Sequence, residues 1–132
     1  MIKERRDLSL AKSIGLILFS LSIAVIGQIL LKIGVNKIGI SDFSKISAIK
    51  DLFLGVIKSP MVLFGLLLYV LSAAVWLIVL STVDLSFAYP FIGLTYVFVL
   101  LLSKFILKED VNPIRWAGAA VITIGVIIIS RG

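Results

Sequence analysis

The sequence predicts an all-α membrane protein with four transmembrane helices. Of its 132 residues, 61% are hydrophobic and only 15% are charged, and the mean hydropathy is +1.21. A soluble domain is about half apolar and about a quarter charged. Because a helix needs about 20 residues to cross the roughly 30 Å hydrocarbon core, the chain has room for about four crossings and none for a soluble catalytic domain.

Four long apolar runs account for these crossings. They predict spans at about residues 13–33, 60–80, 85–107 and 113–130, in one domain over residues 1–132. The first run lies between Lys12 and Lys32 and, at about 19 residues, exceeds the apolar core of a signal peptide. We therefore interpret it as a retained helix. Trp76, near the end of the second run, suits the membrane interface.

Helix-start signals and short links order the last three spans. Pro60 opens the second span, and Asn112 as N-cap with Pro113 opens the fourth. The links at residues 81–84 and 108–112 are short. We therefore expect spans two, three and four to pack as antiparallel neighbours in a compact bundle.

The segment between the first two spans predicts an amphipathic interfacial helix at about residues 42–57. Apolar residues recur through it at helical spacing, and charged residues fall largely on the other side. The apolar positions are Phe43, Ile46, Ile49, Leu52, Phe53, Val56 and Ile57, and the charged ones are Lys45, Lys50 and Asp51. After a cap at Ser41-Asp42, the helix lies in the interface or begins the second span early. It either only anchors the protein or helps to form a substrate entrance.

The net charge of +6 is divided evenly between the two ends of the bundle. One side has Lys3, Arg5, Arg6, Lys12 and Arg131, and the other has Lys37, Lys45, Lys50, Lys58 and Lys108. The positive-inside rule therefore predicts no single orientation. Insertion in both orientations would produce this balance, although a pairing partner or the long first loop would also override the count. We expect a membrane as partner and no nucleic acid.

The sequence lacks the groups on which most catalytic chemistry depends. It has no Cys and no His, no Gly-rich phosphate loop, no acidic pair suited to a metal and no nucleophile beside a base. We therefore predict a protein that is not an enzyme, with no catalytic residue, no metal and no cofactor. The carboxylates lie in tails, loops or helix ends, so none is placed to exchange protons inside the membrane.

Polar residues of the first span form a candidate site. Ser20, Ala24, Gln28 and Lys32 are four apart and make a slanted stripe along the helix. Gln28 and Lys32 are costly if they face lipid. Gln28 either faces a substrate or joins helices by hydrogen bonding. Lys32 either binds a phosphate or extends to the headgroups.

A second candidate face lies on the third span. It is expected to hold Tyr89, Gly93, Tyr96, Leu100 and either Ser103 or Lys104, although a tyrosine stripe also serves packing. Gly93 would let another backbone or a ligand approach. Pro90 removes a backbone donor and is expected to kink the helix near its start.

The fourth span has small residues at two-turn spacing. Gly118 and Gly125 are seven apart, which permits close helix contact. We favour a dimer interface there over internal packing, because four helices alone enclose little cavity.

Three strings of residues resemble a known family. They are Val25-Ile26-Gly27-Gln28-Ile29-Leu30-Leu31-Lys32, Val83-Asp84-Leu85-Ser86-Phe87-Ala88-Tyr89-Pro90, and Lys108-Glu109-Asp110-Val111-Asn112-Pro113 followed by Trp116-Ala117-Gly118. In this order they resemble the four-helix small-multidrug-resistance branch of the drug/metabolite transporters, over nearly all of the membrane part. Within that superfamily they are most similar to the small subunits of the undecaprenyl-phosphate-aminoarabinose flippase.

The resemblance implies paired subunits that move a lipid-linked sugar across the bacterial inner membrane, in lipopolysaccharide modification. It implies a homodimer, in an antiparallel arrangement, or a heterodimer with a paralogous subunit. Drug exporters of this superfamily have a glutamate in the first helix where this chain has Ala24. The resemblance therefore speaks against proton-coupled export of cationic drugs, while Tyr89, Gly118 and Gly125 match.

The leading hypothesis is a flippase or transporter subunit for a polyprenyl-phosphate-linked sugar. The lipid tail would stay in the bilayer through a side portal while the headgroup crosses a polar groove between paired bundles. We expect Gln28, Tyr89, Tyr96 and the Ser20 side of the first helix to line that groove.

Charged residues at one end of the bundle complete the hypothesis. Lys32, Lys104 and Arg115 would attract the phosphate as charge-assisted donors. Glu109 would pair with one of these cations or with an aminosugar, or would only orient its turn. Asp84 is expected to cap the start of the third span.

Two alternatives follow from the same residues. One is a small-multidrug-resistance-type exporter of small molecules that uses another carboxylate, such as Glu109, for coupling. The other is a non-transporting scaffold subunit for a glycosyltransferase, in which Gln28 and Lys32 need not face a cavity.

Overall fold

The computed structural model describes residues 2–38 and 46–132 and confirms the predicted fold class. Its elements are α1 (Ile2–Ile38), α2 (Ile46–Lys58), α3 (Pro60–Thr82), α4 (Leu85–Ala88), the 3-10 turn η1 (Tyr89–Ile92), α5 (Gly93–Phe105) and α6 (Pro113–Ser130). Four stretches are long and apolar enough to cross a membrane: Ser9–Ile38, Pro60–Thr82, Leu85–Phe105 and Pro113–Ser130. The third span is therefore α4, η1 and α5 together.

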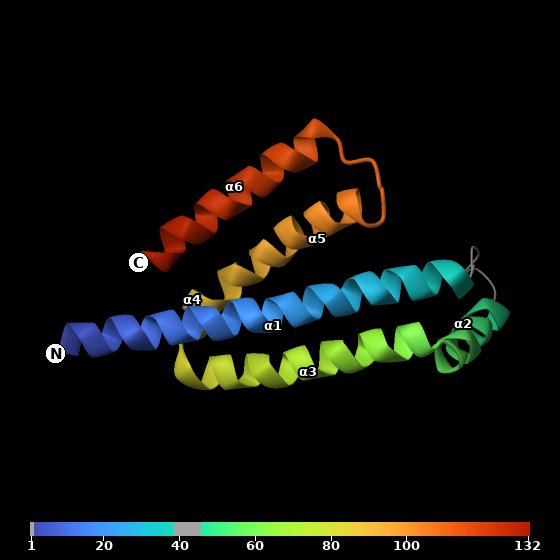
Figure 1. Cartoon of the computed structure of the whole chain (residues 1–132), viewed down its shortest axis with the longest axis horizontal. Helices are drawn as coiled ribbons and strands as arrows, with labels where there is room; N and C mark the ends of the chain where they lie inside the picture. The colour runs from blue at the N-terminus through green and yellow to red at the C-terminus, as the bar shows by residue number, and fades with distance from the viewer. Residues whose placement is uncertain (1, 39–45) are drawn as a thin grey trace.

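The longest contact in the fold is between α1 and α3, which pack antiparallel along their lengths (Figure 1). Small residues allow this, because a Cβ at Gly27 would lie 2.9 Å from the carbonyl oxygen of Gly65. The apolar stretch of α1 has 30 residues, or about 45 Å of helix. Since this exceeds the hydrocarbon core, α1 must tilt or extend beyond it.

The apolar core lies toward the N-terminal half of α1, where all four spans converge. Its buried members are Ile17, Leu21, Val79, Ala88, Phe91 and Val126. Toward the other end of the molecule, α5 and α6 diverge from the α1–α3 pair (Figure 1). The bundle is thus closed by packing at one end and opens toward the end where α2 lies.

The second and third spans are not the packing neighbours that their short link led us to expect. Within residues 2–38 and 46–132, α3 contacts the third span chiefly at α4, and α1 lies between α3 and α5 (Figure 1). Val83 and Asp84 are both extended, so these two residues bridge more distance than a tight turn. The last two spans do pack against each other, as α5 and α6.

The amphipathic segment forms a separate helix, α2, and is not an early start of α3. Ser59 interrupts the helix and its hydroxyl accepts a hydrogen bond from the Val62 N–H at 3.4 Å. The α2 face that points away from the bundle is apolar, with Ile46 88% and Phe53 66% exposed. The cap expected at Ser41-Asp42 lies outside the described residues.

The N-cap residues of the last two spans differ in whether their side chains make a capping hydrogen bond. The Asn112 side chain accepts a hydrogen bond from the Arg115 N–H at 2.9 Å, as expected for an N-cap. Asp84 occupies the N-cap position of α4, but its carboxylate makes no capping hydrogen bond. Pro90 lies in η1, so the expected disturbance near the start of the third span is a 3-10 turn.

Candidate functional site

A pocket of about 220 Å³ lies where α1 faces both α3 and the third span. Its lining comes from Ser20, Leu21, Ala24 and Gln28 of α1, Tyr69, Ser72, Ala73 and Trp76 of α3, and Ile92 and Thr95 of the third span. Three members of the polar stripe expected on the first helix therefore face one pocket. Lys32, the fourth member, is exposed and does not line it.

Two contacts between α1 and α3 hold the pocket walls in place. The Ser20 hydroxyl donates to the Ser72 carbonyl at 2.8 Å, and both residues are buried. The Ser72 hydroxyl in turn donates to the Tyr69 carbonyl within α3, at 2.6 Å. About two turns further along, the backbones meet at Gly27 and Gly65. The Ser20–Ser72 hydrogen bond and the Gly27–Gly65 backbone contact therefore fix the part of α1 to which Gln28 belongs.

The pocket is uncharged and mostly apolar, with a few polar side chains in its lining. Gln28 is half-buried and provides an amide that both donates and accepts hydrogen bonds. Tyr69 and Trp76 add aromatic surface with a polar edge. Because Ala24 stands where a glutamate would place a charge, the lining has no ionised side chain. Such a site can hold a ring-shaped ligand against the aromatic side chains while the Gln28 amide makes hydrogen bonds to it.

Sequence reasoning missed the contribution of α3 to this pocket. It placed Trp76 at the membrane interface and assigned nothing to Tyr69 or Ser72. Their spacing was a usable signal, since Tyr69, Ser72 and Trp76 stand at i, i+3 and i+7 and therefore share one helix face. No spacing rule says which helix that face meets.

The two tyrosines expected in the groove do not line this pocket. Tyr89 is 61% exposed and Tyr96 is 40% exposed. Each residue of a 3-10 helix rotates the chain about 20° more than a residue of an α-helix does. The four residues of η1 therefore add about 80° of rotation between Tyr89 and Tyr96. The shared face expected for Tyr89, Gly93 and Tyr96 assumed an unbroken α-helix. Gly93 instead receives the Ile122 side chain of α6, which would lie 3.0 Å from a Cβ there.

The three cations expected to attract phosphate are all exposed, on segments nearer the α2 end of the molecule. The Lys104 ammonium lies over the Trp116 ring, 5.2 Å from its centroid, which is a cation–π contact between α5 and α6. Arg115 belongs to the first turn of α6, and Lys32 lies on α1. They belong to three different helices, and the structure pairs only Lys104 with an aromatic side chain among the described residues.

Glu109 lies in the link between α5 and α6. Its side chain is exposed, and its backbone N–H donates to the Ser103 carbonyl at 3.0 Å. Lys108, just before it, has a φ of 55°, a left-handed conformation that closes the turn after α5. The backbone therefore orients this turn without help from the Glu109 carboxylate.

A separate apolar groove of about 200 Å³ runs between α1 and α5. It is lined by Ser22, Val25, Ile26, Phe98, Leu101 and Leu102. Ser22 donates its hydroxyl proton to the Leu18 carbonyl of its own helix, so even this residue presents little polarity. The groove uses a different face of α1 from the Gln28 pocket, since Ser22 and Ile26 lie between the turns of the Ser20–Gln28 stripe.

The two glycines of the fourth span have open space beside them. No described residue comes within 4 Å of the point where a Cβ would lie at Gly118 or Gly125. Internal packing of the chain therefore does not use these positions. Much of α6 is exposed as well, with Val121 at 69% and Ile128 at 65%.

The sequence of the chain matches a known family. The model of the EamA-like transporter family matches residues 54–131, which is more than half of the chain. The chain belongs to the EamA-like transporter family. With four helices able to cross a membrane, this EamA-like transporter is a multi-pass membrane protein. No solved structure matches it.

Several relatives of this EamA-like transporter are named as flippase subunits. It is 34% identical over 112 residues to the probable 4-amino-4-deoxy-L-arabinose-phosphoundecaprenol flippase subunit ArnF of Proteus mirabilis, covering 83% of this chain and 84% of that protein. It is 41% identical over 61 residues to the corresponding ArnE subunit of Pseudomonas savastanoi, covering 46% and 54%. The ArnE subunit of Salmonella paratyphi B is 41% identical over 71 residues, covering 52% and 64%. The chain thus spans about half the length of the Pseudomonas ArnE relatives that it matches.

Proposed function

We propose that this chain is a subunit of a flippase that moves a polyprenyl-phosphate-linked aminosugar across the bacterial inner membrane. The observation that supports this is an uncharged pocket that presents the Gln28 amide and two aromatic side chains, inside the spans of a chain whose relatives are named as aminoarabinose-phosphoundecaprenol flippase subunits. The protein is a transporter subunit and not an enzyme.

The sugar ring would pass through the Gln28 pocket. Crossing the bilayer strips water from the sugar hydroxyls, and each unpaired polar group inside the hydrocarbon region is costly. The Gln28 amide replaces part of that hydration by donating and accepting hydrogen bonds. Trp76 and Tyr69 offer flat apolar surface to the C–H face of the ring. The pocket lowers the barrier for the headgroup without fixing a charge inside the membrane.

The lipid tail would remain outside the Gln28 pocket. The groove between α1 and α5 is apolar and lies on a neighbouring face of α1, where Phe98 and Leu102 would contact an isoprenoid chain. When the substrate tail replaces bilayer lipid against these apolar side chains, the free energy changes little. The tail can therefore follow the headgroup without leaving the bilayer. The Gln28 pocket and the apolar groove are separated by α1 itself.

The phosphate would be attracted by Lys32, Lys104 and Arg115. All three side chains are exposed, as they must be to meet a headgroup at the membrane surface. The Lys104 ammonium is held above Trp116, which limits its motion while leaving its protons available to oxygen acceptors. Glu109 on the adjoining link would exclude a second anion from the same area.

The subunit would act as a dimer that pairs through α6. Open space at Gly118 and Gly125 lets a second helix approach the α6 backbone closely. The even division of positive charge allows that partner to be a copy in the opposite orientation or a paralogous subunit. A paired arrangement would also enclose the end of the bundle where α5 and α6 diverge.

Transport by the assembled protein tests this function. The oligomer, purified as it assembles in its host membrane, is reconstituted with a fluorescent polyprenyl-phosphate-aminosugar, and a membrane-impermeant quencher reports the headgroups exposed outside. We expect quenching to exceed that of empty liposomes. Gln28→Leu should slow it by at least about tenfold, because the amide lost is a buried polar partner of the headgroup.

Asn36→Leu is the matched control, since Asn36 is an exposed amide on α1 that lines neither the Gln28 pocket nor the groove between α1 and α5. It should leave the rate unchanged. Correctly assembled protein that moves no more lipid than empty liposomes would contradict the flippase. Flipping that survives Gln28→Leu would show that the headgroup does not cross through the Gln28 pocket. A protein that moves no lipid but supports the activity of a co-purified glycosyltransferase would be a scaffold.

A further inference from the structure

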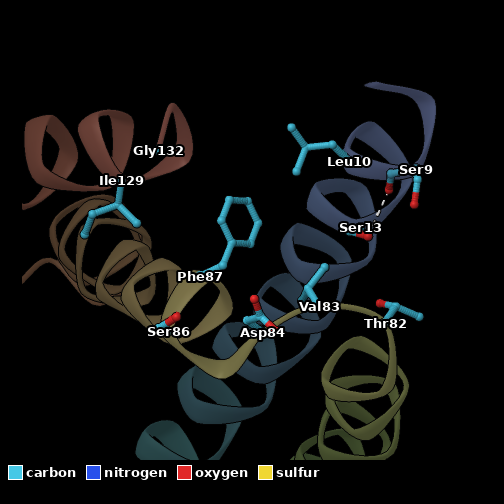
Figure 2. Close-up of a pocket in the computed structure, with 10 residues that line it drawn as sticks. All are labelled: Ser9, Leu10, Ser13, Thr82, Val83, Asp84, Ser86, Phe87, Ile129 and Gly132. Carbon is cyan, nitrogen blue, oxygen red and sulfur yellow. Dashed lines mark hydrogen bonds between the residues drawn. The ribbon is translucent and has the colours of Figure 1, made fainter. Parts of the chain in front are cut away.

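A second cavity, at the opposite end of the bundle from the cations, is built from different chemistry. It has a volume of about 730 Å³ and lies between the N-terminal half of α1, the link from α3 to α4, and the end of α6 (Figure 2). Its ten lining residues are Ser9, Leu10, Ser13, Thr82, Val83, Asp84, Ser86, Phe87, Ile129 and Gly132. Asp84 is the one charged side chain among them.

Several polar groups of this cavity are hydrogen-bond acceptors. Ser13 donates its hydroxyl proton to the Ser9 carbonyl and Thr82 donates to the Val79 carbonyl, both at 2.9 Å. A hydroxyl that has donated its proton can only accept further hydrogen bonds. Pro90 has no N–H to offer to the Ser86 carbonyl, which loses its usual donor within the helix.

The Asp84 carboxylate is available to a ligand. It stands at the N-cap position of α4 but accepts no hydrogen bond from that helix. No lysine or arginine lines the cavity with it among residues 9–38 and 46–132, whose side chains the structure describes. Figure 2 shows the Asp84 side chain beside Val83 and near the Phe87 ring, so the charge adjoins an apolar wall. Asp84 is exposed, so a cation can reach its carboxylate.

We propose that this cavity binds a primary ammonium group through Asp84, and that the ammonium is that of the aminosugar headgroup. The identity of the ligand rests on the proposed function, whereas the cationic character of the ligand rests on the lining alone. An ammonium has three donors and no acceptor, which complements a carboxylate among acceptor oxygens. Phe87, Leu10 and Ile129 would contact the carbon skeleton of the ligand.

The position of the cavity makes it a separate station on the transport path. Along α1, Ser13 is 19 residues from Lys32, or about 29 Å of helix. A single sugar phosphate is shorter than this, so Asp84 and Lys32 cannot hold the same headgroup at once. The two ends of the bundle therefore bind opposite charges of the substrate in turn, the phosphate at one end and the amine at the other.

Binding to the purified oligomer in detergent tests the site with three probes. They are a polyprenyl-phosphate-aminosugar, the same lipid with its amine acetylated, and putrescine as a free amine without lipid or sugar. We expect the amine lipid to bind at least about tenfold more tightly than its acetylated form, and Asp84→Asn to abolish that difference. Asn is an equally good N-cap residue, so the variant should fold normally, which its thermal unfolding would verify. Asp51→Asn, a change of an exposed carboxylate on α2, is the control and should preserve the difference.

The outcomes separate the site from the function. Equal binding of both lipids by the unmodified protein, or a preference for the amine that survives Asp84→Asn, would overturn the ammonium site even if flipping is intact. An Asp84-dependent affinity for putrescine that equals the affinity for the amine lipid would show a site for free amines and overturn the assignment to the headgroup. Asp84-dependent binding of the amine lipid in a protein that flips nothing would support the site and contradict the flippase.

Discussion

Gly27 of α1 and Gly65 of α3 meet backbone to backbone. A Cβ at either position would lie 2.9 Å from the carbonyl oxygen of the other, and the two distances are equal because the antiparallel helices cross there. Within a membrane, helices associate through close packing and hydrogen bonds more than through burial of apolar area. This contact therefore fixes how α1 and α3 face each other, and with it the pocket beside Gln28.

Gly27→Ala should destabilise the protein by about 1–3 kcal/mol, because the added methyl group meets a backbone oxygen that cannot move aside. Unfolding in mixed micelles, followed by tryptophan fluorescence, measures the change. Gly15→Ala is the matched control, since nothing described lies within 4 Å of that position. Equal stability of the two variants would show that the helices do not touch at Gly27.

Ser20→Ala should cost about 0.6–1.7 kcal/mol, since it removes the buried hydrogen bond from α1 to the Ser72 carbonyl. The same substitution at Ser22 removes a hydrogen bond within one exposed turn and should cost much less. The difference between the two unfolding free energies isolates the interhelical contribution. No difference would mean that the Ser20 hydroxyl finds an equivalent partner in the unfolded helices.

Ala24→Glu should give the pocket an affinity for apolar cations. The new carboxylate would stand among Gln28, Tyr69 and Trp76, where aromatic rings add cation–π attraction. Binding of tetraphenylphosphonium, measured by equilibrium dialysis in detergent, should appear in the variant and weaken as the pH falls, because protons compete for the carboxylate. Ala24→Gln has nearly the same shape without charge and should bind none. Binding by that neutral variant would contradict the role of charge.

Lys104 and Trp116 should be coupled by about 0.5–1 kcal/mol, the typical strength of an exposed cation–π contact. A double-mutant cycle with Lys104→Met and Trp116→Leu measures this coupling from four unfolding free energies. If the two single effects simply add, the ammonium does not rest on the ring in the folded protein.

Gly118→Leu should raise the dissociation constant of the dimer by at least about tenfold while leaving the stability of the single chain unchanged. Energy transfer between labelled subunits in liposomes reports the dimer. Ala120→Leu enlarges an exposed small residue on the other face of α6 and serves as control. Unaltered energy transfer in Gly118→Leu would place the interface on another helix.

Hydropathy and spacing were sufficient for the parts of the fold that each helix decides for itself. The spans follow from apolar length, α2 from its alternating faces, and the Asn112 cap from a local hydrogen bond. The alignment of Ser20, Ala24 and Gln28 on one face also follows from helical spacing alone. Each of these features depends on residues only a few positions apart, so a single sequence contains all the information needed.

Other features depended on how helices meet. The sequence by itself determined the four spans and the alignment of Ser20, Gln28 and Lys32 along the first. It also determined that position 24 of this span is an alanine and not a carboxylate. Only the tertiary structure decided that Tyr69 and Trp76 complete the pocket, that the turn at Pro90 directs Tyr89 and Tyr96 elsewhere, and that α1 separates α3 from α5. The physical reason is that contacts such as Gly27 with Gly65 and Ser20 with Ser72 join residues far apart in the chain, and helical periodicity does not encode which faces will meet.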